Sequence, residues 1–328
     1  MVEAFVTDTI VYASLFGLMA LGLTLTYLTT KVPNFAYGSF VTIGMYTAFA
    51  LYRTQKINPY ASAPIAFLLG AVASVAMYLG VLRILSKRGS SLVALMIATL
   101  AVDIAFVGIF GIYSDYLTLR YALINSKYFY PIPDSFTLFG TAGIVYVAPI
   151  SLCIVTLAVF LLLTRSKFGV AMRASVENPS LARVLGINVE NVYVFAWFLA
   201  GGFAAMSGSY YVLWLPGGIT GGSNLIVEIF AASVLGGLAS IYGAVLGGLV
   251  IGASEVLVTK VALDRLGSWV GIYQKGIPLI IMVVTLLVLP KGLTSINWRR
   301  TLVSTYPSVR SELRRLYHSI LKLARIGS

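Results

Sequence analysis

Residues 227–259 read Val227-Glu-Ile-Phe-Ala-Ala-Ser-Val-Leu-Gly-Gly-Leu-Ala-Ser-Ile-Tyr-Gly-Ala-Val-Leu-Gly-Gly-Leu-Val-Ile-Gly-Ala-Ser-Glu-Val-Leu-Val-Thr259. The stretch is almost wholly apolar, but the doublets Gly236-Gly237 and Gly247-Gly248 interrupt it. A membrane-spanning helix needs about 20 mostly apolar residues, so this stretch is long for one crossing and short for two. It therefore predicts a re-entrant hairpin or two short helices, which are tolerated at that depth only where protein or a water-filled cavity covers them.

The rest of the chain has the composition of a membrane protein. Of its 328 residues, 59% are hydrophobic and 10% are charged, whereas a soluble domain carries about 25% charged residues. Further apolar runs predict membrane helices at 6–29, 36–52, 61–83, 92–113, 143–163, 192–214 and 271–290. We therefore expect an all-α polytopic helical membrane protein with about 8-9 membrane segments, some of them glycine-broken or re-entrant.

The distribution of positive charge predicts the topology. Loops rich in Lys and Arg stay in the cytoplasm, and such loops follow the third and fifth apolar runs. Residues 294–328 are also basic and predict an amphipathic cytoplasmic tail, which either lies on anionic lipid or docks a partner. This arrangement leaves residues 1–293 as the transmembrane domain. It places the N-terminus, 115–134 and 214–224 outside, and it requires 227–259 to enter and leave on one side.

Acidic residues inside apolar runs are candidates for function, because burying a charge in a membrane is costly. Asp103 interrupts the fourth run, and Glu228 and Glu255 lie near the two ends of 227–259. Asp103 either faces a transport pathway or pairs with a Ser, a Thr or a cation from another helix. Glu228 and Glu255 either line the pathway or lie at the membrane interface.

A second interruption separates the first two apolar runs. Pro33 ends helical structure before it, and Asn34 is a natural N-cap for the helix that follows. Broken segments in the two halves of a transporter point to its binding region. The predicted pathway residues are Asn34, Phe35, Tyr37, Gly38, Asp103, Glu228, Gly236, Gly237 and Gly243. For any single glycine, close helix packing is the alternative explanation.

The cytoplasmic loop 165–191 is a polar stretch in a chain that has few others. Asn178-Pro179 predicts the start of a short helix with Pro at its first position, and Gly186 is placed to end it. Leu181, Ala182, Val184 and Leu185 would give this helix an apolar side. Such a helix suits a soluble partner that pushes on the membrane helices, although it could equally lie on lipid headgroups.

The residues that are missing limit the possible chemistry. The chain has one Cys and one His, so no metal cluster is predicted, and the sequence contains no nucleotide-binding P-loop motif. Three hypotheses remain at this point: a transporter driven by a partner, a transporter or channel driven by an ion gradient, and a membrane-embedded enzyme. The sequence offers few residues with which a membrane-embedded enzyme could catalyse a reaction.

Several motifs resemble the permeases of branched-chain amino acid ABC transporters, and the early Asn-Phe-Ala-x-Gly element resembles their H-type subunit. These motifs are Ala20 to Tyr27, Asn34 to Gly38, Arg173 to Asn188, Ala232 to Gly248, and Leu289 to Leu293. One departure is Tyr37, where the family pattern most often has His.

The resemblance implies an importer in the cell inner membrane, with a second and different permease subunit, two cytoplasmic ATPase subunits and an external substrate-binding protein. It implies a branched-chain or other small neutral amino acid as cargo, with urea or short amides as alternatives. ATP and Mg would bind to the ATPases, with no cofactor in this chain. The residues that it implies for ATPase coupling are Arg173, Glu177, Asn178, Pro179, Ala182, Arg183 and Gly186.

Overall fold

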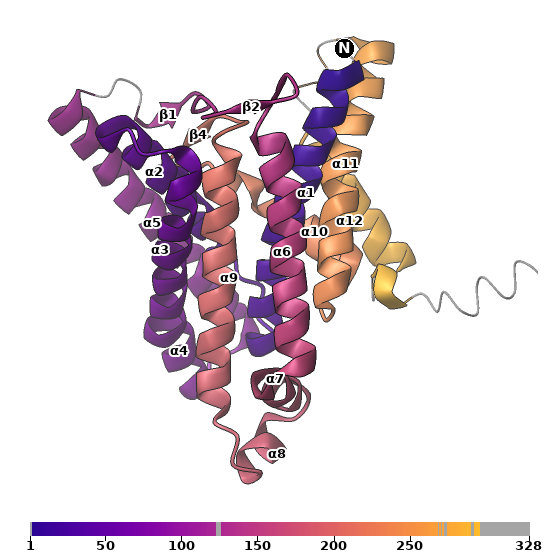
Figure 1. The fold of residues 1–328 in the computed structure, drawn as a ribbon. Helices are drawn as coiled ribbons and strands as arrows, with labels where there is room; N and C mark the ends of the chain where they lie inside the picture. The colour runs from indigo at the N-terminus through magenta and orange to yellow at the C-terminus, as the bar shows by residue number, and fades with distance from the viewer. Residues whose placement is uncertain are drawn as a thin grey trace, which may run out of the picture.

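The computed structural model describes residues 2–122, 126–267, 269, 271, 274–289 and 292–295. The chain is a bundle of long helices with short strands at one end, which confirms the expected all-α membrane fold (Figure 1). The predicted amphipathic tail lies outside the described residues, except for Thr294 and Ser295.

The helices follow the apolar runs of the sequence. They are α1 (Val2–Thr30), α2 (Tyr37–Gln55), α3 (Ser62–Met77), α4 (Arg83–Lys87), α5 (Leu92–Tyr121), α6 (Ile144–Arg165), α7 (Lys167–Glu177), α8 (Pro179–Val184), α9 (Val189–Tyr211), α10 (Ile226–Gly236), α11 (Ile241–Leu266) and α12 (Gly276–Val288). A π-helical turn, Tyr78–Leu82, joins α3 to α4, and short 3₁₀ turns cover Pro59–Ala61, Ser223–Leu225 and Leu293–Ser295.

Within the described residues, six helical segments are long and apolar enough to cross a membrane. They are Phe5–Thr30, Pro59–Lys87, Leu92–Tyr121, Ile144–Arg165, Val189–Tyr211 and Ile241–Arg265. Ser223–Gly236 and Gly276–Val288 are shorter apolar helices. The membrane helix predicted at 271–290 is shorter in the structure, where α12 has 13 residues. A helix of this length rises only about 20 Å, which is less than the ~30 Å hydrocarbon core.

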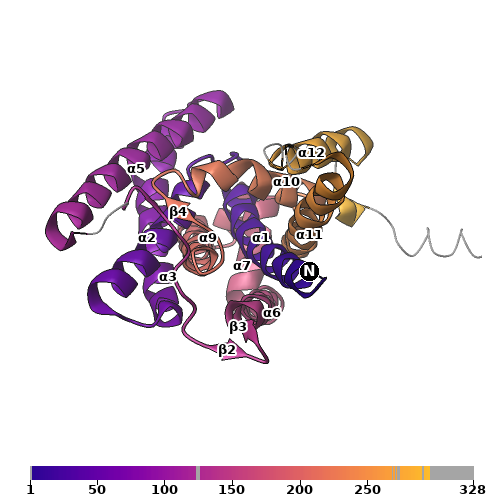
Figure 2. The same ribbon diagram turned by 90° about the horizontal axis from the view of Figure 1, so that it is seen from above.

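Helix α1 lies at the centre of the bundle, between α9 and α11 (Figure 2). Its side chains are apolar all round, which is typical of a helix buried on every side. Leu18 and Leu21 of α1 are fully buried, as is Trp197 of α9. The Trp197 indole Nε1 donates a hydrogen bond to Thr29 Oγ1 at 3.1 Å, so the core also fixes the polar end of α1.

The glycine-broken stretch 227–259 forms a hairpin of unequal arms, α10 with 11 residues and α11 with 26. Lys260 of α11 lies 4.0 Å from the ring centroid of Phe5, so α11 returns to the N-terminal end of α1. The hairpin expected as one alternative is therefore present, and the prediction that the stretch enters and leaves on one side of the membrane stays a prediction. The expectation of two short helices was wrong for the second arm, because Gly247 and Gly248 lie inside a continuous helix.

The segments predicted to share a side with the N-terminus are physically joined there. Strand β1 (Tyr128–Phe129) pairs antiparallel with β4 (Gly217–Gly218), and β2 (Thr137–Leu138) pairs with β3 (Thr141–Ala142). Trp214 Nε1 also donates to Asp8 Oδ1 of α1 at 2.9 Å. The strands and the N-terminus lie at the top of Figure 1, whereas α4, α7 and α8 lie at the bottom.

Candidate functional site

Asp103 joins its own helix, α5, to two other segments of the chain. Its Oδ1 accepts hydrogen bonds from Ser39 Oγ at 2.5 Å and from Ser223 Oγ at 3.1 Å. Ser39 lies in the first turn of α2, and Ser223 begins the turn that leads into α10. Of the two alternatives for Asp103, the structure shows pairing with serines of other segments. The side chain is half-buried, so it keeps some access to the surface.

The interruption before α2 lies next to this carboxylate. Asn34 is buried, and its Oδ1 accepts from the Ala36 amide at 3.1 Å. The predicted N-cap role was wrong in detail: α2 begins at Tyr37 after Ala36, which makes no side-chain cap, and Asn34 closes a tight Asx turn instead. The Phe35 amide donates to Thr99 Oγ1 of α5 at 3.2 Å, which holds the interruption against that helix.

Phe35 and Tyr37 point to different places. The half-buried Phe35 ring lies 5.3 Å from the ring of Phe230 in α10, so these two aromatic side chains form a partly open apolar pair. Tyr37 is 0% exposed, and its hydroxyl donates to the Ala200 carbonyl of α9 at 3.5 Å. Tyr37 therefore packs inside the bundle and does not share the surface of Phe35.

Gly38 allows α2 to touch the segment before α10. A Cβ added to Gly38 would lie 2.5 Å from the Gly222 carbonyl oxygen, and one added to Gly222 would lie 1.9 Å from that of Gly38. The Gly222 amide also donates to Thr42 Oγ1 at 2.9 Å. The starts of α2 and α10 are thus in direct backbone contact, with Asp103 beside them.

Gly236, Gly237 and Gly243 form the tip of the α10–α11 hairpin. A Cβ on Gly236 would lie 2.0 Å from the Gly243 carbonyl oxygen, and one on Gly243 would lie 2.1 Å from that of Gly236. Gly237 has a positive φ of 101° and ends α10. Gly236 and Gly243 therefore allow close packing of α10 against α11, which was the alternative explanation for single glycines.

Glu228 and Glu255 lie inside the protein, with 1% and 4% of their surface exposed. Glu255 Oε1 accepts from Gln274 Nε2 at 3.0 Å, whereas Oε2 of each glutamate has no hydrogen-bond partner among the described residues. Both side chains are packed inside the protein, and their position relative to the membrane interface stays a prediction. Neither carboxylate bonds to the Asp103 junction, so the predicted pathway residues do not form one cluster.

The segment 165–191 projects beyond the membrane helices as two helices, α7 and α8 (Figure 1). Only α8 was predicted. Ser166 caps α7 by accepting from the Gly169 amide at 3.1 Å. The Arg173 guanidinium donates to the Leu163 carbonyl, which folds α7 back on the end of α6. Glu177 is exposed at the last position of α7.

Helix α8 begins and ends as predicted. The Asn178 side chain accepts from the Leu181 amide at 3.0 Å, with Pro179 at the first helical position. Gly186 has a φ of 82° and follows the last turn. Ala182 is buried against the protein, whereas Val184 is 83% exposed and Leu185 69% exposed. The predicted apolar side is therefore split, and its larger residues face outward.

A cavity of about 490 Å³ separates α7 from the tip of the α10–α11 hairpin. Its lining includes Arg173 and Glu177 on one side and Ser240 to Tyr242 on the other. Tyr193 of α9 donates its hydroxyl hydrogen to the Ser175 carbonyl of α7 at 3.2 Å. Tyr193 was not predicted as a site residue, because nothing in its local sequence marks a contact 18 positions away.

These features define a polytopic helical transport protein with interrupted helices inside the bundle and a projecting helix pair at one end. The family described as branched-chain amino acid transport system / permease component matches residues 5–286, and the chain belongs to it. It is a membrane permease subunit of an ABC importer.

Two named relatives match over most of their length. The chain is 43% identical over 291 residues to the probable branched-chain amino acid transport permease protein LivH of Methanocaldococcus jannaschii, with 89% of this chain and 92% of that protein covered. It is 26% identical to the high-affinity branched-chain amino acid transport system permease protein BraD of Pseudomonas aeruginosa, with 85% and 91% covered. The solved PsaBC structure from Streptococcus pneumoniae, in complex with Fab, matches with 12% identity and a TM-score of 0.49, covering 89% of this chain and 97% of that one.

Proposed function

We propose that this permease imports branched-chain or other small neutral amino acids across the inner membrane. The names of the two relatives support this cargo. The aromatic pair Phe35–Phe230 adds a partly open apolar surface beside one hydrogen-bonded carboxylate, Asp103. Such a surface suits an apolar side chain attached to a zwitterion.

The exposed apolar tip of α8 carries the second part of the proposal, a docking site for a cytoplasmic ATPase. Val184 and Leu185 would be costly to leave in water in a helix of only six residues. The cap of Asn178 and the turn at Gly186 fix their direction. A partner that covers this tip would gain apolar burial on a rigid element.

Movement of α7 and α8 would reach the membrane helices through two described contacts. Tyr193 links α7 to the start of α9, and Arg173 links α7 to the end of α6. Because ATP would bind two partner subunits in this proposal, the work comes from its different affinity for their two states. No cofactor is proposed in this chain, and ATP with Mg belongs to the ATPases.

The proposed positions of the remaining subunits follow from the exposed surfaces of this chain. Helix α5 exposes large apolar residues along its length, including Ile104, Ile112 and Leu119. We place a second, different permease on this side, so that the transport route runs between the two and past Phe35 and Asp103. The strand-bearing end carries the N-terminus and would face outward, where a substrate-binding protein docks. The basic ends of α4 and α6 support this orientation.

The test is co-purification of the ATPase with a Val184→Glu, Leu185→Glu double variant. The matched control is Phe139→Glu, which changes an equally exposed apolar residue at the opposite end. We expect the ATPase to be recovered with wild type and control, and to be lost with the double variant. Recovery of the ATPase with all three proteins would show that the docking site is not at the tip of α8. Recovery with none would favour transport driven by an ion gradient.

The cargo is tested separately by uptake into vesicles that contain the assembled importer. We expect radiolabelled leucine to accumulate with ATP, and unlabelled isoleucine and valine to compete. Competition by urea or acetamide alone would assign the importer to short amides instead.

A further inference from the structure

A cavity of about 170 Å³ lies at the same end of the bundle as α7 and α8. Five separate segments line it: the end of α1, the π-helical turn with α4, the start of α5, α8, and the start of α9. A π-helical turn is rare and is often found at a functional site. None of the residues predicted for the transport pathway lines this cavity.

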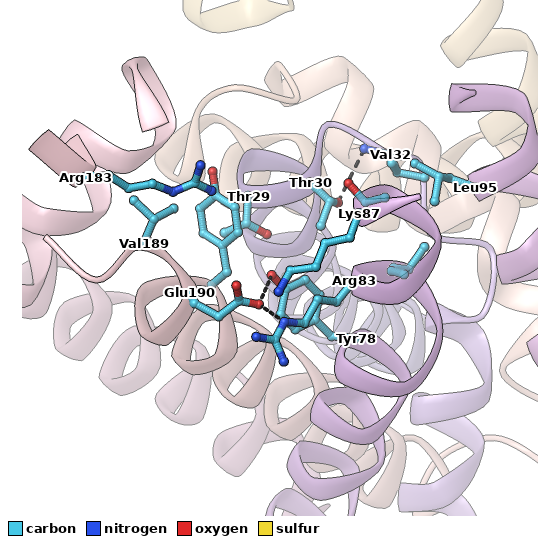
Figure 3. A pocket seen from close by; sticks show the side chains of 13 residues that line it. Thr29, Thr30, Val32, Tyr78, Arg83, Lys87, Leu95, Arg183, Val189 and Glu190 are labelled. Atoms are coloured by element: carbon cyan, nitrogen blue, oxygen red, sulfur yellow. Dashed lines mark hydrogen bonds and ion pairs between the residues drawn. The ribbon is translucent and has the colours of Figure 1, made fainter. Parts of the chain in front are cut away.

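The cavity collects positive charge. Arg83 and Lys87 extend into it from α4, and Arg183 reaches it from α8 on the other side (Figure 3). Glu190 is the one acid in the lining, so the formal charge of the lining side chains is positive by two. Glu190 forms an ion pair with Arg83 and accepts from the Tyr78 hydroxyl at 3.5 Å.

Two of these cations have no acidic partner among the described residues. Across the described part of the chain, no carboxylate lies within ion-pair distance of Lys87 or Arg183. Basic residues at a cytoplasmic membrane face are common, and Lys87 and Arg183 are both exposed. Here they point into one cavity from two helices that are far apart in the sequence.

The rest of the lining adds hydroxyl groups and an apolar wall. Ser86 supplies a hydroxyl donor, whereas the hydroxyls of Thr30 and Tyr193 already donate to the carbonyls of Thr26 and Ser175. The aliphatic residues of the lining are Val32, Leu82, Leu95 and Val189. Arginine, lysine and hydroxyl donors together are the groups that bind phosphoryl oxygens in proteins.

We propose that this cavity binds a phosphoryl anion. The net positive charge of the lining favours an anion over the proposed cargo. A zwitterionic amino acid has no net charge and would leave the excess of two positive charges unbalanced. A phosphate group carries about −1.5 to −2 charge at neutral pH and would balance it. The group comes either from an anionic lipid headgroup or from soluble phosphate. Basic pockets between membrane helices on the cytoplasmic side bind such headgroups.

The bound anion would connect α4 to α8 directly. Arg183 belongs to the proposed docking helix, whereas Lys87 lies outside it in α4. A ligand held by both would restrain α8 relative to the membrane helices. The inference goes beyond the proposed transport function, since it concerns a second ligand at a separate place.

The experiment measures binding to the full-length chain, purified with its partner subunits and stripped of lipid. One arm titrates phosphatidylglycerol against phosphatidylcholine of the same acyl chains, read by native mass spectrometry. The other titrates potassium phosphate against potassium chloride, read by calorimetry. The variants are Lys87→Glu and Arg183→Glu, with Lys87→Gln and Arg183→Gln as milder forms. Arg120→Glu is the control, because Arg120 lies at the opposite end, in the last turn of α5.

We expect one phosphoryl ligand to bind per permease. Binding should be at least tenfold weaker in each Glu variant, and Arg120→Glu should bind like wild type. Saturation by phosphatidylglycerol alone assigns the lipid source, and saturation by phosphate assigns the soluble one. The proposal is overturned if neither probe saturates, or if the Lys87 and Arg183 variants bind like wild type. Uptake is not the readout, so a wrong cargo assignment would not affect the result.

Discussion

Ser39 donates its hydroxyl hydrogen to Asp103 across 2.5 Å, although the two residues are 64 positions apart and lie on different helices. The same carboxylate oxygen accepts from Ser223, which is 120 positions further along the chain. One side chain therefore positions the starts of two interrupted helices. Its replacement should affect the stability of the bundle and, on the proposed function, the transport route.

The first prediction concerns this carboxylate. In Asp103→Ala, the Ser39 and Ser223 hydroxyls lose their acceptor, and we expect the free energy of unfolding to fall by about 1–3 kcal/mol. Asp103→Asn keeps a carbonyl oxygen at the same place and should lose less. Thermal unfolding of the purified protein in detergent measures both changes. Equal stability of wild type and the Ala variant would contradict the bonding described.

The second prediction concerns the hairpin tip. In Gly243→Val, the new side chain would meet the Gly236 carbonyl oxygen, with its Cβ at 2.1 Å, so α10 and α11 must separate. We expect a loss of about 1–3 kcal/mol or more and a lower yield of folded protein. Gly108→Val is the matched control, because nothing lies within 4 Å of a Cβ at that helical position. A similar yield for both variants would argue against the close contact.

The third prediction concerns the end of α8. Gly186 has a φ of 82°, a conformation that costs an L-residue roughly 1–2 kcal/mol. Gly186→Ala should therefore loosen α8, whereas Gly186→Asn should be better tolerated, because Asn adopts this conformation more readily. Hydrogen exchange of the amides in 179–186 measures the difference. Slow exchange in the Ala variant would show that the turn does not limit α8.

The fourth prediction concerns the basic cavity. Glu190→Gln removes the one acid from its lining and releases Arg83 from the ion pair. Two charges 4 Å apart in water interact by about 1 kcal/mol, which corresponds to about fivefold in affinity. We expect phosphoryl binding to tighten by about that factor, and to weaken as salt is added. Weaker binding in Glu190→Gln would mean that Glu190 helps to hold the ligand.

Local signals made α8 predictable from the sequence. Asn178, Pro179 and Gly186 act on their immediate neighbours, so their types and spacing are enough to define the two ends of the helix. Helix α7 was missed because Lys167, Arg173 and Glu177 place charges along its 11 residues, so the segment resembles a polar loop. Its contacts with the bundle, such as that of Arg173 with Leu163, are not visible in the local sequence. The membrane runs were predictable because each depends only on its own hydrophobicity.

The contacts between segments could not be predicted in the same way. Asp103 bonds to residues 64 and 120 positions away, and a single sequence does not indicate which serines they are. Tyr37 sits in the same motif as Phe35, yet one is buried against α9 and the other is partly open beside α10. Near the start of a helix, residues that are two positions apart point in different directions. The packing of the other helices then determines what each side chain contacts.

The contact between Gly38 and Gly222 also brings two helix starts next to a carboxylate that has no lysine or arginine within ion-pair distance among the described residues. The aligned peptide dipoles of an α-helix sum to a partial charge of roughly +0.5 at its N-terminal end. Helices α2 and α10 both begin next to Asp103, and their combined partial charge is close to the single negative charge of the carboxylate. If the proposed transport route passes Asp103, a zwitterionic cargo would meet a carboxylate whose charge is partly balanced by these two helix starts.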